Sequence, residues 1–243
     1  MRFFIFTFMF ISCLKAEEVY AYFDVYAMNQ SFLAMETAGV VKQIFVKPSQ
    51  LVKKGDVLLE LENSSEKIAL QLAKNDYELA LTELNNSKSK LSKFSKVKDV
   101  LDSQSFEDMQ GAFEEARLKA KKAELNIKRY EDALEKKTLK APYDAIVANK
   151  FINVGEGVSP TSQKLFEIFS YPQVKLLLSF DEKYKDKVKI GQTYRYKVAN
   201  EEKEAKIDLI YPSIDVKNRK IYAEAYTTGL TVGLFGEGSI IIK

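Results

Sequence analysis

The central part of the chain carries a seven-residue hydrophobic repeat. Residues 63–137 contain no proline and one glycine, and they are rich in Lys, Glu, Ala and Leu. This composition favours a helix. The first set of apolar positions is Leu70, Tyr77, Leu84 and Leu91 with Ala73, Ala80 and Phe94, and the second is Phe106, Phe113, Ala120, Ile127 and Leu134 with Met109, Ala116, Ala123 and Tyr130. The spacing predicts two helices that pack as a coiled coil.

A polar stretch between the two sets marks a turn. It includes Lys98, Asp99 and the residues 102–105, and Ser105 with Asp108 is expected to cap the second helix. The result is an antiparallel hairpin over 63–137, with arms of about 32 residues and roughly 50 Å. Basic and acidic residues are nearly balanced there, at 15 and 14. Mixed charge of this kind indicates a solvated face rather than a nucleic-acid surface.

Two similar β-rich segments, 39–62 and 138–169, flank the predicted hairpin. Residues 52–58 and 152–158 share one pattern, which is apolar, two residues, glycine, acid, one residue, apolar. The glycines, Gly55 and Gly155, are expected to take a positive φ in tight turns, with the apolar neighbours in a shared core. The repeat therefore predicts one small β domain whose two halves pair beside the base of the hairpin.

These half-motifs resemble a known family. Gly39, Val41, Ile44 and Val46 with the 52–58 turn resemble the first half of a biotinyl/lipoyl-like domain, and residues 140–147 resemble the second half. Ala145 stands where the family usually has glycine. A lipoyl-like domain split by an α-hairpin is the layout of periplasmic adaptor subunits, or membrane fusion proteins, of tripartite efflux pumps, the HlyD/RND-type adaptors. The resemblance covers about residues 35–240.

The resemblance implies an elongated α+β fold with a hairpin inserted in a lipoyl-like domain, followed by a small β-barrel. The expected parts are a signal peptide at 1–16, N-terminal strands at 17–38 that join the barrel, the lipoyl-like domain at 39–62 and 138–169, the hairpin at 63–137, and the barrel at 170–243. Larger adaptors continue into a membrane-proximal domain, and we expect that domain to be rudimentary or missing here.

The amino-acid composition excludes several classes of catalytic, metal and disulfide site. The 243 residues include no His, no Trp and one Cys, and the net charge is +3. The absence of His excludes His-based catalytic triads, and the usual zinc sets and an intrachain disulfide need more Cys or His than the chain has. A charge so close to neutral argues against a dedicated nucleic-acid binder. Enzymes that use only carboxylates, Lys, Ser or Tyr survive these exclusions. The family resemblance, rather than the composition, implies that the protein has no enzyme activity and no cofactor.

The N-terminus resembles an export signal. A basic start precedes the apolar run Phe3–Ile11, which is too short to span a bilayer, and Ala16 precedes an acidic pair. This predicts export with cleavage after Ala16, and the family resemblance implies a periplasmic protein associated with the inner membrane. The alternative is lipidation at Cys13, because residues 10–13 loosely resemble a lipobox.

The expected partners follow from the family resemblance. They are an inner-membrane transporter, an outer-membrane channel, and further copies of this chain in a ring such as a hexamer, with no nucleic acid. Related adaptors of resistance-nodulation-division (RND) pumps often carry an Arg-Leu-Ser pattern at the hairpin tip. The nearest analogues here are Lys93, Val97 and Ser103, which differ in type and spacing, and an ordinary solvated turn is the alternative.

Three functions remain open at this point. An adaptor of an RND-type transporter for small-molecule efflux is the leading hypothesis. An adaptor of an ABC-type exporter, or of a copper efflux system that uses the thioethers of Met28 and Met35, is the alternative. A lipoyl or biotin carrier subunit is remote, because the hairpin replaces the turn that holds the carrier lysine. The sequence leaves the transported substrate, the pump class and the oligomer number undetermined.

Overall fold

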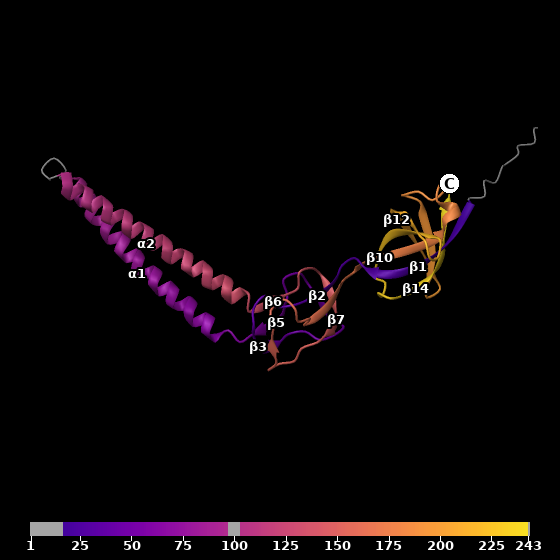
Figure 1. Cartoon of the computed structure of the whole chain (residues 1–243), viewed down its shortest axis with the longest axis horizontal. Helices are drawn as coiled ribbons and strands as arrows, with labels where there is room; N and C mark the ends of the chain where they lie inside the picture. Colours follow the sequence, from indigo (N-terminus) through magenta and orange to yellow (C-terminus); the bar gives the residue numbers. More distant parts are fainter. Residues whose placement is uncertain (1–16, 97–102, 243) are drawn as a thin grey trace, which may run out of the picture. The chain divides into compact units, whose positions relative to one another are not determined.

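A computed structural model describes residues 17–96 and 103–242, which form two compact units. One unit contains the hairpin and most of a two-sheet β domain, and the other contains a β-barrel (Figure 1). The barrel strands are β1 (Glu17–Ala27), β10 (Gln173–Asp181), β11 (Thr193–Val198), β12 (Glu201–Asp215), β13 (Lys220–Thr228) and β14 (Phe235–Ile242). The other strands are β2 (Gln30–Leu33), β3 (Gly39–Ile44), β4 (Leu51–Val52), β5 (Val57–Leu61), β6 (Thr138–Lys140), β7 (Ala145–Lys150), β8 (Gly157–Val158) and β9 (Phe166–Ser170).

The predicted hairpin is confirmed. Helix α1 (Ser64–Ser95, 32 residues) and helix α2 (Ser103–Glu135, 33 residues) lie side by side along their lengths (Figure 1). All of the predicted heptad positions are buried or half-buried, and three of them, Ala73, Ala116 and Ala120, are buried. The predicted cap at Ser105 is wrong, because α2 begins two residues earlier and Ser105 lies inside the helix.

The β domain consists of two four-stranded sheets that both mix the halves of the chain. One sheet has the order β2-β9-β7-β4 and the other the order β6-β5-β3-β8. Each sheet therefore takes two strands from before the hairpin and two from after it. Assigning all of residues 17–38 to the barrel is wrong for β2, which pairs in this domain, whereas β1 does join the barrel.

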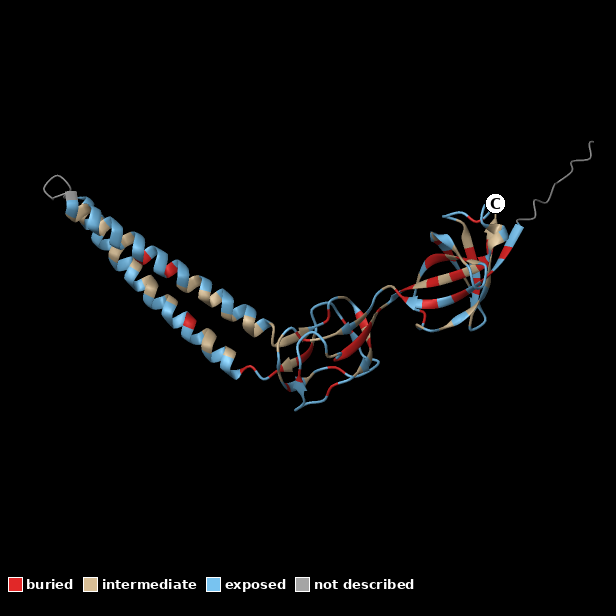
Figure 2. Ribbon diagram, viewed as in Figure 1, coloured by how far each residue is buried: buried red, intermediate tan, exposed pale blue. Residues whose placement is uncertain are grey.

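The barrel is closed, with the strand order β1-β10-β13-β12-β11-β14. Alternation of buried and exposed residues is regular in β1, where every second residue from Val19 to Ala27 is buried. The 3₁₀-helix η2 (Glu182–Tyr184) follows β10. Buried residues fill the barrel, whereas the hairpin contains few (Figure 2).

Three aromatic rings fill the barrel interior beside two glycines. Tyr194 and Tyr196 stack with centroids 5.5 Å apart, and Phe23 meets Tyr196 edge-on at 5.2 Å. A Cβ on Gly236 would lie 2.8 Å from the Phe23 ring, and one on Gly238 would lie 2.8 Å from the Tyr194 ring. The rings of Phe23 and Tyr194 thus occupy the space that side chains at Gly236 and Gly238 of β14 would need. Burial raises the pKa of Tyr194, whose hydroxyl donates a hydrogen bond to a main-chain carbonyl of β1.

Candidate functional site

The end of the hairpin far from the β domain is the candidate channel contact. Lys93 lies in the last turn of α1 and is exposed. Val97 lies outside the described residues. Ser103 is the first residue of α2, and its side chain is also outside the described part. The fold brings Lys93 and Ser103 to the same end of the hairpin (Figure 1).

Ion pairs fix the antiparallel alignment of the two arms. Lys119 of α2 lies 3.2 Å from Glu83 of α1 and also 3.2 Å from Glu115 on its own helix. Hydrogen bonds to Glu115 and Glu83 raise the pKa of Lys119. Near the base, Lys137 lies 3.1 Å from Glu66. These pairs join positions that face each other only in one register, so they specify alignment more than they add stability.

The outer surface of the hairpin carries exposed leucines that the seam pattern did not predict. Leu72 and Leu79 on α1 are 59% and 71% exposed, and Leu118 and Leu125 on α2 are 59% and 54% exposed. Within each pair the spacing is seven, and each residue lies two positions after a seam residue. These leucines therefore form a second heptad repeat in the sequence. Each helix contributes only two leucines to it, so the repeat is short. Exposed apolar tracks on a helix mark a surface that can pack against another protein.

The two repeat turns connect the halves of the β domain in the same way. Gly55 has φ 92° and Gly155 has φ 87°, a region that glycine adopts without strain. The Gly55 N–H donates to the carbonyl of Ala141 at 2.8 Å, and the Ala141 N–H donates to Asp56 at 2.9 Å. The corresponding pair joins Gly155 and Glu156 to Val41.

In that second pair, the Gly155 N–H donates to the Val41 carbonyl, and the Val41 N–H donates to the Glu156 carbonyl, both at 2.9 Å. Each glycine turn thus binds a residue of the opposite half, and the repeat is a structural one. The hairpin is inserted between two halves that hold each other through equivalent turns.

Residues 30–169 match the family described as CzcB-like, barrel-sandwich hybrid domain. The match covers more than half of the chain and both halves of the β domain. The chain belongs to this family. A curated relative, an uncharacterized protein of Haemophilus influenzae, is 27% identical over 169 residues, which make up 67% of this chain and 39% of that protein's length.

Solved structures share the fold. MacA from Actinobacillus actinomycetemcomitans has a TM-score of 0.68 at 19% identity and covers 94% of this chain and 79% of its own. The membrane fusion protein Spr0693 from Streptococcus pneumoniae has 0.67 at 17%, covering 93% and 97%. A MacA–MexA chimera with the Pseudomonas aeruginosa MexA α-hairpin domain has 0.62 at 20%, covering 94% and 82%. The α+β fold with an inserted hairpin is therefore confirmed for this CzcB-like chain.

The remaining sequence candidates are two methionines and Cys13. Met35 is buried and Met28 is half-buried, and the two belong to different compact units. Cys13 lies outside the described residues. Within 17–96 and 103–242, no group of three or more His, Cys, Asp or Glu side chains is placed to hold a metal ion. In the same ranges no helix is both long enough and apolar enough to cross a membrane.

Proposed function

We propose that this CzcB-like protein is a periplasmic adaptor that links an inner-membrane transporter to an outer-membrane channel for the efflux of small molecules. The observation that carries the proposal is the hairpin inserted between the two interlocked halves of the barrel-sandwich hybrid domain. A rigid two-helix arm of about 50 Å suits a bridge between two partners. The adaptor itself performs no catalysis.

An RND-type transporter is the partner we favour, with export by a cleaved signal peptide. The predicted cleavage after Ala16 favours this class over type I secretion adaptors. An ABC-type exporter or a copper efflux system would use the same arm. Drug accumulation in a deletion strain, measured with and without a proton uncoupler, distinguishes a proton-driven pump from an ATP-driven one. Sensitivity to copper without sensitivity to drugs would support the copper system.

Contact between the hairpin tip and a channel is tested by photo-crosslinking. A photoreactive amino acid replaces Lys93 at the tip, and the matched control replaces Lys74, which is also exposed on α1 but lies about 28 Å nearer the β domain. We expect a crosslink to an outer-membrane channel from position 93 and none from position 74. Crosslinking from position 74 alone, or from neither position, would contradict contact at the tip.

The need for an intact arm is tested in cells. Leu84→Pro interrupts α1 in the middle of the seam, since proline removes a helix hydrogen bond and clashes with the preceding turn. We expect the variant to accumulate in the periplasm but to lose efflux. The control, Gly111→Ala, adds a methyl group in open space on α2 and should keep efflux. Full efflux in the Leu84→Pro strain would show that the hairpin is not the coupling element.

Self-association into a ring is supported by the outer leucine track. Side-by-side copies would cover Leu72, Leu79, Leu118 and Leu125, which are otherwise exposed to water. Many weak contacts of this kind add up in a closed ring. Sedimentation of a Leu72→Glu, Leu79→Glu variant should show a smaller assembly than the wild type. An unchanged assembly would exclude this face from the interface.

A further inference from the structure

A pocket on the barrel lies against the apolar core, beside an irregular pairing of two strands. Strand β12 pairs with β13 through Ile210↔Ala223 and Ile214↔Ile221, and three residues of β12 lie between these pairs against one residue of β13. The extra residues include Pro212, which has no N–H to pair. A pocket of about 460 Å³ is lined by this irregular segment of β12.

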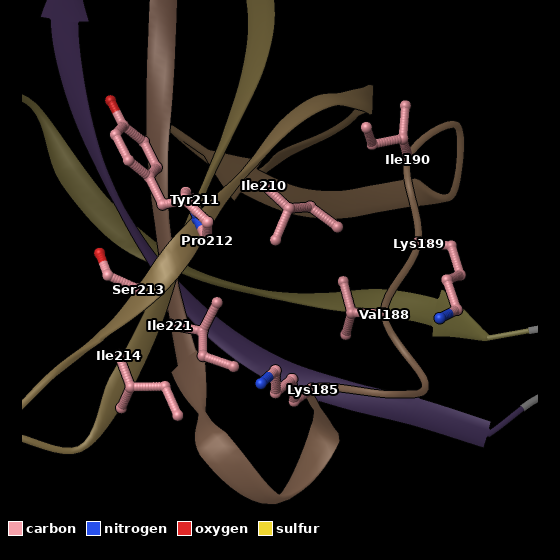
Figure 3. A pocket seen from close by; sticks show the side chains of 10 residues that line it. All are labelled: Lys185, Val188, Lys189, Ile190, Ile210, Tyr211, Pro212, Ser213, Ile214 and Ile221. Carbon is pink, nitrogen blue, oxygen red and sulfur yellow. The ribbon is translucent and has the colours of Figure 1, made fainter.

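The floor of this pocket is the core itself. Val188 and Ile221 line it and belong to the buried cluster of the barrel, and Ile210 and Ile214 pack against the same cluster. Figure 3 shows Ile210, Val188 and Ile221 around one space, whereas the side chains of Tyr211 and Ser213 lie on the other side of the β12 ribbon.

The segment after η2 forms the other wall. The Val188 N–H donates a hydrogen bond to the Tyr184 carbonyl at 3.0 Å. In the turn that follows, the Gly191 N–H donates to the Ile207 carbonyl at 2.8 Å. Between these anchors Ile190 is 64% exposed. An apolar side chain left in water at the mouth of an apolar pocket favours an apolar occupant.

The charged residues at the mouth are both basic. Lys185 and Lys189 line the pocket, and neither has an ion-pair partner within the described chain. None of the ten lining residues is acidic. Three other pockets of the barrel each include at least one acidic residue, such as Asp215 or Glu204. The potential at this pocket therefore favours an anion.

We propose that this pocket binds a single-chain anionic amphiphile of the fatty-acid class, with the alkyl chain against Ile190, Ile210 and Ile214 and the carboxylate beside Lys185 and Lys189. At roughly 30 Å³ for each water-sized group, the pocket accommodates about fifteen non-hydrogen atoms, which suits a medium-length chain. The site is independent of the adaptor role, and neither conclusion depends on the other.

The test uses the full chain with decanoate as the probe. Isothermal titration calorimetry should show saturable binding of decanoate, and at least tenfold weaker binding of butyrate, which has the same head group and a short tail. Decyltrimethylammonium, with the same tail and the opposite charge, should also bind at least tenfold more weakly. Isoleucine methyl NMR spectra should shift at Ile190, Ile210 and Ile214 but not at Ile68 of the hairpin.

Two double variants distinguish a specific effect of the pocket lysines from an effect of the protein's net charge. Lys185→Glu with Lys189→Glu should weaken decanoate binding at least tenfold, and the control Lys88→Glu with Lys90→Glu, which makes the same charge change on α1, should leave it within twofold. All four lysines are exposed, so folding is expected to be unaffected. Absence of saturable decanoate binding by the wild type, equal binding of the cationic amphiphile, or an equal effect of both double variants would overturn the proposal. Binding to anionic vesicles without binding to free decanoate would also overturn it, by indicating a membrane surface instead.

Discussion

Adding one methyl group to Gly238 should destabilise the barrel strongly. A Cβ at this position would lie 2.3 Å from the main-chain carbonyl oxygen of Arg195 and 2.8 Å from both Cζ and Oη of Tyr194. The carbonyl belongs to β11, which pairs with β14 across this position, so it cannot rotate away as a flexible side chain could. Either the two strands separate or the Tyr194 ring moves.

The expected loss in the free energy of unfolding is the sum of two contributions. Overpacking a filled core costs about 1–3 kcal/mol. Moving the ring also breaks the 2.9 Å hydrogen bond from the Tyr194 hydroxyl to the Ala21 carbonyl, which adds about 1 kcal/mol. We expect Gly238→Ala to lower the free energy of unfolding by about 2–4 kcal/mol, or roughly 10–30 °C in Tm for a domain of this size.

The assay is thermal and urea unfolding followed by near-ultraviolet circular dichroism, because the chain has no Trp and the stacked, buried tyrosines of the barrel contribute to that signal. The control is Gly157→Ala, whose Cβ meets nothing within 4 Å. Adding Tyr194→Phe to Gly238→Ala should restore only part of the loss, since the contact with the Arg195 carbonyl remains. A Gly238→Ala variant within about 0.5 kcal/mol of the wild type would refute the packing argument.

Three further predictions concern single residues. Gly111→Ala should stabilise the hairpin by about 0.5–1 kcal/mol in far-ultraviolet melts, because alanine loses less backbone entropy than glycine in a helix; a lower melting temperature would contradict this. Gly55→Val should cost about 1–3 kcal/mol in urea unfolding, because its φ of 92° strains a branched residue, and an unchanged midpoint would exclude strain at the turn. Burial acts to raise the pKa of Glu224, but hydrogen bonds from Lys175 and Tyr211 outweigh it and lower the pKa, so its stabilisation is present near neutral pH and is lost as the pH falls through that lowered value. Glu224→Gln should therefore be less stable than wild type at pH 7 and lose less stability on acidification to pH 3, and parallel pH curves would contradict the assignment.

The hairpin was predictable because its signal is long and local. Nine residues of α2 and seven of α1 repeat the seam pattern, and such a seam has one way to be buried. The turns at Gly55 and Gly155 could be predicted from the sequence for a related reason. The same seven-residue pattern occurs twice, which chance rarely produces on both sides of one helical segment.

Other features depend on contacts between residues far apart in the sequence. β2 has only four residues and weak alternation of burial, so nothing local shows that it pairs with β9 rather than joining β1 in the barrel. Tyr194 and Tyr196 look like ordinary strand tyrosines, and their burial depends on the absence of side chains on β14. The pocket beside β12 is lined by an irregular segment whose extra residues are defined only by pairing with β13.

The inserted hairpin also has a consequence for how the molecule folds. The Leu61 N–H bonds to the Lys137 carbonyl at 2.8 Å, directly at the base of the hairpin. Closing a disordered loop of about 75 residues between these points would cost roughly 4 kcal/mol of chain entropy. Contacts between the helices form locally, starting near the turn, and each successive heptad shortens the free loop until the strand halves meet. The arm proposed to reach a distant partner is thus also the element that lets its own β domain assemble, and damage to the coiled coil should slow that assembly without altering a single residue of the sheets.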